Sequence, residues 1–310
     1  MSFAADCREE LIRIRLHEKK TRLSQLAGLT LTAGGIRLGK KASIFFQTES
    51  LPVAKHIISL ATGDYNLDSV IEQKEKKSRR KPLYAVNLSG IDIERFLSDT
   101  GALRYGSDGL HILSDIPDEV SVNEETKRAF LRGSYLGGGT CVDPRRRYHL
   151  ELIQHTQSVA TGILALINGH GLHARITERK DQFVIYLKEG DDVMGFLALI
   201  GADSAALSFE NVRTEKDMRN YINRTNNCES ANIDKQVVAS LKQQAAIRMI
   251  LDRIPLERLP RSLRDTIELR LNNPEASLTQ LAELAGIQRS GMNHRLSRLL
   301  ELAAKLEEDV

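Results

Sequence analysis

The stretch Leu26-Ala-Gly-Leu-Thr-Leu-Thr-Ala-Gly-Gly35 decides the fold, because a similar stretch occurs again about one hundred residues later. The second copy reads Leu131-Arg-Gly-Ser-Tyr-Leu-Gly-Gly-Gly139. Both copies have the pattern of a helix that is rich in small residues and ends in glycines. Self-similarity at a fixed spacing indicates a repeated structural unit. We therefore expect two helices of the same kind, one in each half of a duplicated domain.

The segments after the two copies follow the same order. A strand-like run comes first, then an amphipathic helix, a β-hairpin and a short helix with a Phe-Leu pair. These segments are 36–48, 53–60, 69–88 and 92–100 in the first half, and 140–153, 159–166, 174–187 and 192–200 in the second. Strand pairs that alternate with helices favour an α+β domain over a parallel sheet. The predicted fold class is α+β, a duplicated αββαββα pseudo-dimer followed by an all-α domain.

Helical pattern replaces strand pattern after the second copy. No Pro or Gly occurs from Thr214 to Ile254, which predicts one long polar helix. Pro255 and Pro260 then precede a compact helical segment that runs to the C-terminus. The expected segments are a first half with an N-terminal extension at 1–110, a second half at 119–210, a helical linker at 211–254 and a helical domain at 255–310.

The C-terminal domain has the spacing of a helix-turn-helix motif at about 277–301. Ser277 stands three residues before Gln280, the spacing of a capping box that starts a helix. Ala282 stands four residues before Gly286, and Met292 stands six residues after it. A small alanine lets two helices cross closely, and the glycine forms the turn between them. The buried stripe of the first helix is expected to comprise Leu278, Leu281, Leu284 and Ala285.

The second helix of this motif is expected to expose side chains that suit duplex DNA. Arg, Asn and Gln form paired hydrogen bonds with base edges, and Arg and Ser also contact phosphates. The candidate DNA-binding residues are Gln288, Arg289, Ser290, Asn293, His294, Arg295 and Arg298. The alternative is a solvated helical bundle in which these residues are ordinary surface.

Composition excludes several other classes of protein. No run approaches the roughly 18 uncharged apolar residues of a membrane span. Cys7, Cys141 and Cys228 lie far apart without a C-x-x-C partner, which argues against a zinc cluster and for a reducing compartment. Absence of Trp and an aromatic content of 5% disfavour a platform that stacks single-stranded bases. We expect a cytoplasmic, nucleoid-associated protein without a cofactor or a metal.

Leu26-Ala-Gly-Leu29 resembles the opening of the LAGLIDADG motif of homing endonucleases. The resemblance implies that the two glycine-ended helices pack face to face, and that an acid at each helix end holds Mg²⁺ for phosphodiester hydrolysis. This sequence has Ala33 and Gly138 where those acids belong. Asp143 is the nearest acid after Gly138, but it precedes Pro144 in an expected turn. We therefore expect no catalytic residues and no enzymatic activity.

The chain as a whole resembles the WhiA family of bacterial sporulation and cell-division regulators. The residues that carry this resemblance are Arg132–Gly139, Asp143-Pro144, Tyr148–Glu151, Asn211-Val-Arg213, Met218-Arg-Asn220, Asn223-Arg224, Asn227-Cys-Glu229, Ala231-Asn232 and Ser290-Gly-Met-Asn-His-Arg295. The last of these is similar to Ser-Gly-Val-Asn-His-Arg in typical members. The resemblance implies a DNA-binding transcription regulator linked to cell division and chromosome segregation, and to sporulation in species that sporulate.

Three further groups of polar residues are candidate phosphate or interdomain contacts. They are Lys77, Arg79 and Arg80 in a basic turn, Arg145 and Arg146 in the second half, and Arg219, Asn223 and Arg224 in the linker. The alternatives are solvated loop tips for the first two groups and, for the third, capping around a helix break near Asn226-Asn227.

The expected partner is double-stranded DNA, with RNA polymerase or another transcription regulator as a further candidate and no membrane. Two rival functions stay open. The chain could be an active LAGLIDADG-type endonuclease that uses an unrecognised acid, or a protein-interaction adaptor that contacts RNA polymerase.

Overall fold

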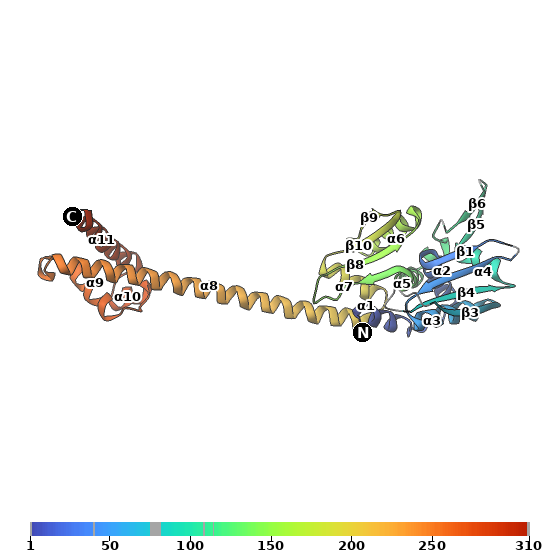
Figure 1. The fold of residues 1–310 in the computed structure, drawn as a ribbon, viewed down its shortest axis with the longest axis horizontal. Coiled ribbons are helices and arrows are strands. Elements are labelled where there is room, and N and C mark those ends of the chain that lie inside the picture. Colours follow the sequence, from blue (N-terminus) through green and yellow to red (C-terminus); the bar gives the residue numbers. More distant parts are fainter. Residues whose placement is uncertain (1, 40, 75–81, 108, 114, 309–310) are drawn as a thin grey trace. The chain divides into compact units, whose positions relative to one another are not determined.

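The computed structural model describes residues 2–39, 41–74, 82–107, 109–113 and 115–308. The chain divides between Lys216 and Asp217 into two units, and each unit has its own hydrophobic core. The first unit contains antiparallel sheets and helices, and the second is helical (Figure 1). The expected fold class is confirmed: a duplicated α+β domain precedes an all-α domain.

The two halves of the first unit repeat the order αββαββα. The first half comprises α2 (Lys19–Ala33), β1 (Gly34–Arg37), β2 (Ser43–Thr48), α3 (Leu51–Asp64), β3 (Leu67–Lys74), β4 (Leu83–Gly90) and α4 (Ile93–Asp99). The second half comprises α5 (Glu124–Gly138), β7 (Gly139–Cys141), β8 (Leu150–Gln154), α6 (Gln157–Gly169), β9 (Arg175–Arg179), β10 (Gln182–Leu187) and α7 (Gly190–Leu199). The sheets have matching orders, β1-β2-β4-β3 and β7-β8-β10-β9, and all their strand pairs are antiparallel.

Several elements of the first unit differ from the expected segments. Each strand-like run is two strands, and the first of each pair follows its helix without a connecting loop. This happens because the backbone becomes extended at Gly34 and at Gly139, the residues that end α2 and α5. Elements outside the expected pattern are α1 (Phe3–Leu11), the hairpin β5 (Leu103–Gly106) and β6 (Gly109–Ile112), and the 3₁₀ turn η1 (Asp118–Ser121).

Helices α2 and α5 cross at the centre of the first unit. A Cβ atom at Gly28 would lie 2.2 Å from the carbonyl oxygen of Phe130, and one at Gly133 would lie 2.1 Å from that of Gln25. The two helices therefore touch backbone to backbone, as their small residues predict. All residues from Ser24 to Thr32 are buried at this crossing.

Helix α8 (Asp203–Arg253) is longer and more regular than the sequence indicates. It begins before Thr214 because its first turn belongs to the first unit, where the backbone N–H groups of Ser204 and Ala205 donate to the Glu10 carboxylate. Phe209 is fully buried there. The alternative of a helix break near Asn226-Asn227 is wrong, because the helix continues through both asparagines.

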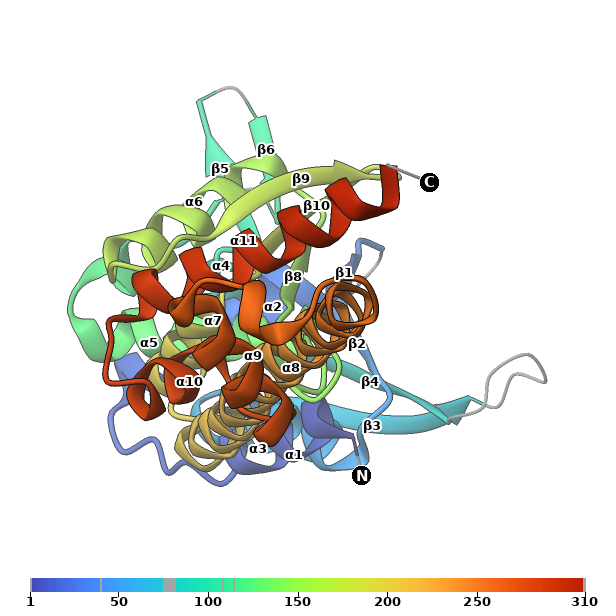
Figure 2. The ribbon, with the colours of Figure 1, turned by 90° about the vertical axis from the view of Figure 1, so that its left-hand side faces the viewer.

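The second unit packs three helices around the C-terminal part of α8 (Figure 2). They are α9 (Arg261–Asn272), α10 (Leu278–Leu284) and α11 (Arg289–Glu308), and the 3₁₀ turn η2 (Leu256–Arg258) precedes them. The core of this unit contains Ala246, Ile247, Ile250, Leu259, Leu263, Ile267, Leu281, Ala282, Met292, Leu296, Leu299 and Ala303. Over the described residues, no helix is both long and apolar enough to cross a bilayer.

Candidate nucleic-acid interface

Helix α10 begins with the expected capping box. The Ser277 Oγ accepts a hydrogen bond from the Gln280 backbone N–H at 3.2 Å, and the Gln280 Oε1 accepts from the Ser277 N–H at 2.8 Å. Two N–H groups that have no partner within the helix are thereby satisfied, which fixes where the helix starts.

The turn between α10 and α11 is a Schellman motif. Gly286 has φ +62°, a backbone conformation that favours glycine. Its N–H donates to the carbonyl of Glu283 at 3.0 Å, and the N–H of Ile287 donates to that of Ala282 at 3.0 Å. The turn therefore closes α10 as the Ala282–Gly286 spacing predicts, and Ala282 is buried in the core.

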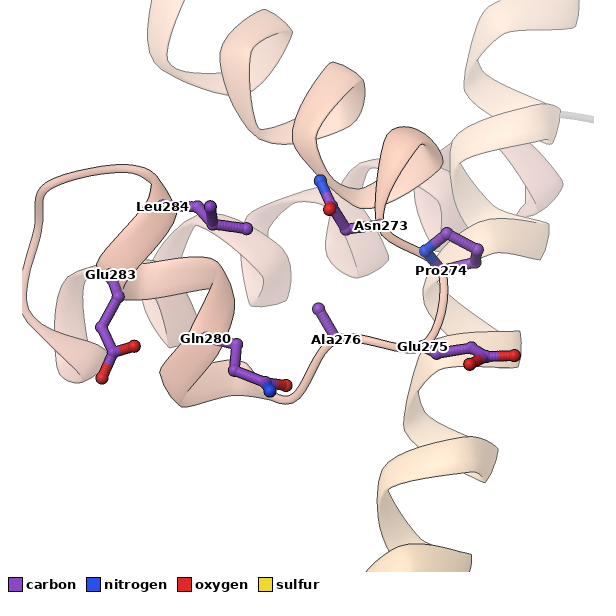
Figure 3. Close-up of a pocket in the computed structure, with 7 residues that line it drawn as sticks. All are labelled: Asn273, Pro274, Glu275, Ala276, Gln280, Glu283 and Leu284. Carbon is purple, nitrogen blue, oxygen red and sulfur yellow. The ribbon is translucent and has the colours of Figure 1, made fainter.

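One expected core residue of α10 is exposed instead. Leu284 is 59% exposed, because Ala285 and Ile287 from the turn pack against the core at the end of the helix. Leu284 lines a surface hollow of about 860 Å³ together with residues of the 273–276 connection (Figure 3). The predicted burial of Leu284 is therefore wrong, whereas that of Leu281 is confirmed.

A buried arginine holds the connection between α9 and α10. Arg270 is 3% exposed, and its Nη1 donates to the Ala276 carbonyl at 2.8 Å; burial lowers the pKa of its guanidinium. From α8, the Ser240 hydroxyl donates to the Pro274 carbonyl, and Gln236 Nε2 donates to that of Glu275 at 2.8 Å. These bonds fix the connection onto α8. Sequence reasoning missed Arg270, which reads as an ordinary basic residue in the last turn of a helix.

Helix α11 separates a buried face from a polar one. Met292, Leu296 and Leu299 are at most 1% exposed. The exposed candidate DNA-binding residues are Gln288, Arg289, Ser290, Asn293, His294 and Arg298, and Arg295 is half-buried. The structure thus places the first six just before α11 and along its first ten residues, where the packed core leaves the helix exposed. Their contact with DNA stays a prediction.

The other candidate contacts lie apart from this helix in the sequence. Arg145 and Arg146 are exposed in a turn, where Asp143 Oδ1 accepts from the Arg145 backbone N–H at 2.8 Å. Asp143 is therefore a turn residue, as expected. The linker residues Arg219, Asn223 and Arg224 are all exposed on α8. Lys77, Arg79 and Arg80 lie outside the described residues.

The paired helix ends of the first unit border a cavity of about 410 Å³. Its lining residues are Thr32, Ala33, Gly34, Gly35, Phe45, Gln47, Gly137, Gly138, Ile153 and His155. None of these residues carries a carboxylate. Across the part of the chain that the structure describes, no group of three or more His, Cys, Asp or Glu side chains could hold a metal ion.

Comparison with known proteins identifies the family. The probable cell division protein WhiA of Alkaliphilus metalliredigens is 36% identical over 309 residues, which cover 98% of each chain. That of Clostridium acetobutylicum is 35% identical over 316 residues, covering 100% of this chain and 99% of the relative. The chain belongs to the WhiA family. The family resemblance inferred from the sequence is thereby confirmed.

Family models match all three structured parts of this WhiA-family chain. The WhiA N-terminal LAGLIDADG-like domain matches residues 19–103, the WhiA LAGLIDADG-like domain 127–219 and the WhiA C-terminal HTH domain 222–303. The crystal structure of full-length DUF199/WhiA from Thermotoga maritima has the same fold, with a TM-score of 0.63 and 23% identity over 98% of this chain and 99% of the other. The N-terminal LAGLIDADG domain of DUF199/WhiA gives a TM-score of 0.52 at 19% identity, over 64% and 90% of the chains.

Proposed function

We propose that this protein is a sequence-specific DNA-binding transcription regulator that acts in cell division and chromosome segregation, and in sporulation where the species sporulates. The observation that carries the proposal is the polar face of α11. The capping box, the Schellman turn and a buried core hold this helix, and its first turns expose Arg289 and Asn293 one turn apart. Arg and Asn are the residues that recognise guanine and adenine by paired hydrogen bonds in the major groove.

We assign separate roles to the segments of the chain. Residues 255–310 read the DNA sequence, residues 211–254 link the domains, and residues 1–110 and 119–210 form a homing-endonuclease scaffold that does not cleave DNA. Ala33 and Gly138 at the helix ends support the last role, because a metal clamp on a phosphate needs acidic ligands there. Double-stranded DNA in the cytoplasmic nucleoid is the proposed partner. RNA polymerase or another transcription regulator is the candidate protein partner.

Genome-wide immunoprecipitation of the full chain tests the DNA-binding role. The wild-type protein should enrich a defined set of sites, and an Arg289→Ala/Asn293→Ala variant should lose them. Lys305→Ala is the control, because Lys305 is an exposed cation near the far end of α11, sixteen residues after Arg289. Retention of the same sites by the double variant would place sequence recognition outside α11.

Incubation with supercoiled plasmid and Mg²⁺ or Mn²⁺ tests the proposed absence of nuclease activity. The expected result is no nicking above the buffer control. Nicking that copurifies with the protein and disappears with a chelator would restore the endonuclease alternative.

A further inference from the structure

The middle of α8 carries two arginines and several asparagines. Every residue from Asp217 to Lys235 is exposed. Asparagine is a poor helix former, and an inert spacer helix would favour Ala, Glu or Lys. Because the helix does not break at Asn226-Asn227, the asparagines are not there to cap or interrupt it.

These polar residues share one face of the helix. At 100° per residue, positions i, i+1, i+4, i+5 and i+8 lie side by side. The residues at those positions are Arg219, Asn220, Asn223, Arg224 and Asn227. We call them the Asn/Arg face. Between these side chains and the rest of the described chain, the structure shows neither a hydrogen bond nor an ion pair.

The charge on this face is positive. Glu229, the one acid between Arg219 and Ser230, projects from the opposite side of the helix, and Asp234 lies beyond the end of the face. The opposite side also carries the exposed apolar residues Met218 and Ile222. A protein partner that needs apolar anchors would bind there, whereas a face of Arg and Asn has the donors that phosphates and base edges accept.

We propose that the Asn/Arg face of α8 is a second DNA-binding surface, in addition to α11. It spans roughly 12 Å of helix axis, from Arg219 to Asn227 at about 1.5 Å per residue, and the major groove of B-DNA admits a helix lengthwise. Arg219 and Arg224 neutralise phosphates, and Asn223 and Asn227 donate to phosphates or to adenine. The inference rests on the proposed function, since it assigns a second contact with the same duplex.

The proposal can be tested by fluorescence anisotropy with the full chain and a labelled DNA duplex. The duplex is about four helical turns long and contains a site mapped by immunoprecipitation. In a plot of log K against the logarithm of the salt concentration, each lost phosphate contact lowers the magnitude of the slope by about one. Arg219→Ala/Arg224→Ala should therefore lower that slope by about two and weaken binding at least tenfold. Circular dichroism checks that the helix content is unchanged.

Asn232 supplies a matched control for Asn223. It lies nine residues on, which is 900° and therefore the opposite side of the same exposed helix. Asn223→Ala and Asn232→Ala change helix propensity equally, but only the first should weaken DNA binding. A photocrosslinker at position 223 should likewise capture DNA, and one at position 232 should not. The proposal would be overturned if both variants bound DNA as tightly as the wild type, or if the photocrosslinker at position 223 captured only protein.

The two proposals fail in different ways. If wild-type protein does not prefer the mapped duplex over an unrelated one, the proposed function fails. If Arg289→Ala abolishes that preference while Arg219→Ala/Arg224→Ala leaves affinity and salt slope unchanged, only the second surface is refuted.

Discussion

The crossing of α2 and α5 makes a sharp prediction about Gly28→Ala. The added Cβ atom would lie 2.2 Å from the Phe130 carbonyl oxygen and 2.8 Å from the Ser134 backbone nitrogen. Both neighbours are backbone atoms of a buried helix, so neither can rotate away. An ordinary contact needs at least 3.4 Å, so the helices would have to separate by about 1 Å.

The expected magnitude follows from two opposing effects. Overpacking a core costs about 1–3 kcal/mol, and a backbone clash belongs at or above the upper end of that range. Ala in place of Gly favours the helix by about 1 kcal/mol. The net loss should be about 2 kcal/mol, which corresponds to a Tm roughly 4–8 °C lower for a domain of this size.

Thermal unfolding followed by circular dichroism measures the effect, with Gly63→Ala as the control. Gly63 lies in the last turn of helix α3, and a Cβ there meets nothing within 4 Å. That variant should be neutral or more stable by up to about 1 kcal/mol. If Gly28→Ala melts at or above the wild-type temperature, the backbone contact between the helices is not the constraint described above.

Three further predictions concern titration, capping and phosphate contact. Burial, with the nearby Arg132, lowers the pKa of His56 to about 4. As the pH falls, His56 therefore binds a proton near pH 6.5 in the unfolded chain but only near pH 4 in the folded chain, so the free energy of unfolding should decrease between about pH 6.5 and 4. Urea unfolding at several pH values across that range should show a weaker dependence of this free energy on pH for His56→Gln than for the wild type. Ser277→Ala should destabilise the second unit by about 1 kcal/mol in urea unfolding. Arg298→Ala should lower the salt slope of DNA binding by about one in anisotropy titrations, without changing sequence preference.

Local pattern was sufficient to predict the duplicated fold. In each half, helical or alternating spacing of apolar residues predicts the helices and strands, and the glycines of the two central helices predict their close crossing. The start of α8 could not be predicted in this way. It depends on Glu10, a carboxylate about two hundred residues away that accepts from the first turn of the helix. Contacts at such separation leave no local signal.

The candidate DNA-binding helix could also be predicted from local sequence. Caps and turns are local, so Ser277, Gln280 and Gly286 could be placed from spacing alone. The hydrogen bonds that hold the preceding connection in place could not be predicted. Arg270 reaches three carbonyls of the connection between α9 and α10, and nothing in its sequence neighbours distinguishes it from a surface arginine.

The packing around Gly138 bears on the proposed loss of nuclease chemistry. A Cβ atom at this position would lie 2.6 Å from the Thr32 Cγ2 and 3.0 Å from the Ile153 carbonyl oxygen. Thr32 is held in place, because its Oγ1 accepts from Gln154 Nε2 at 2.8 Å. An aspartate at 138 would therefore have to displace a hydrogen-bonded core residue before it could reach a metal ion. The opposite helix end has Ala33, whose Cβ is already accommodated. The two ends thus differ: one lacks an acid, and the other also lacks the space for one, so substituting acids at both positions would not by itself rebuild a paired metal site.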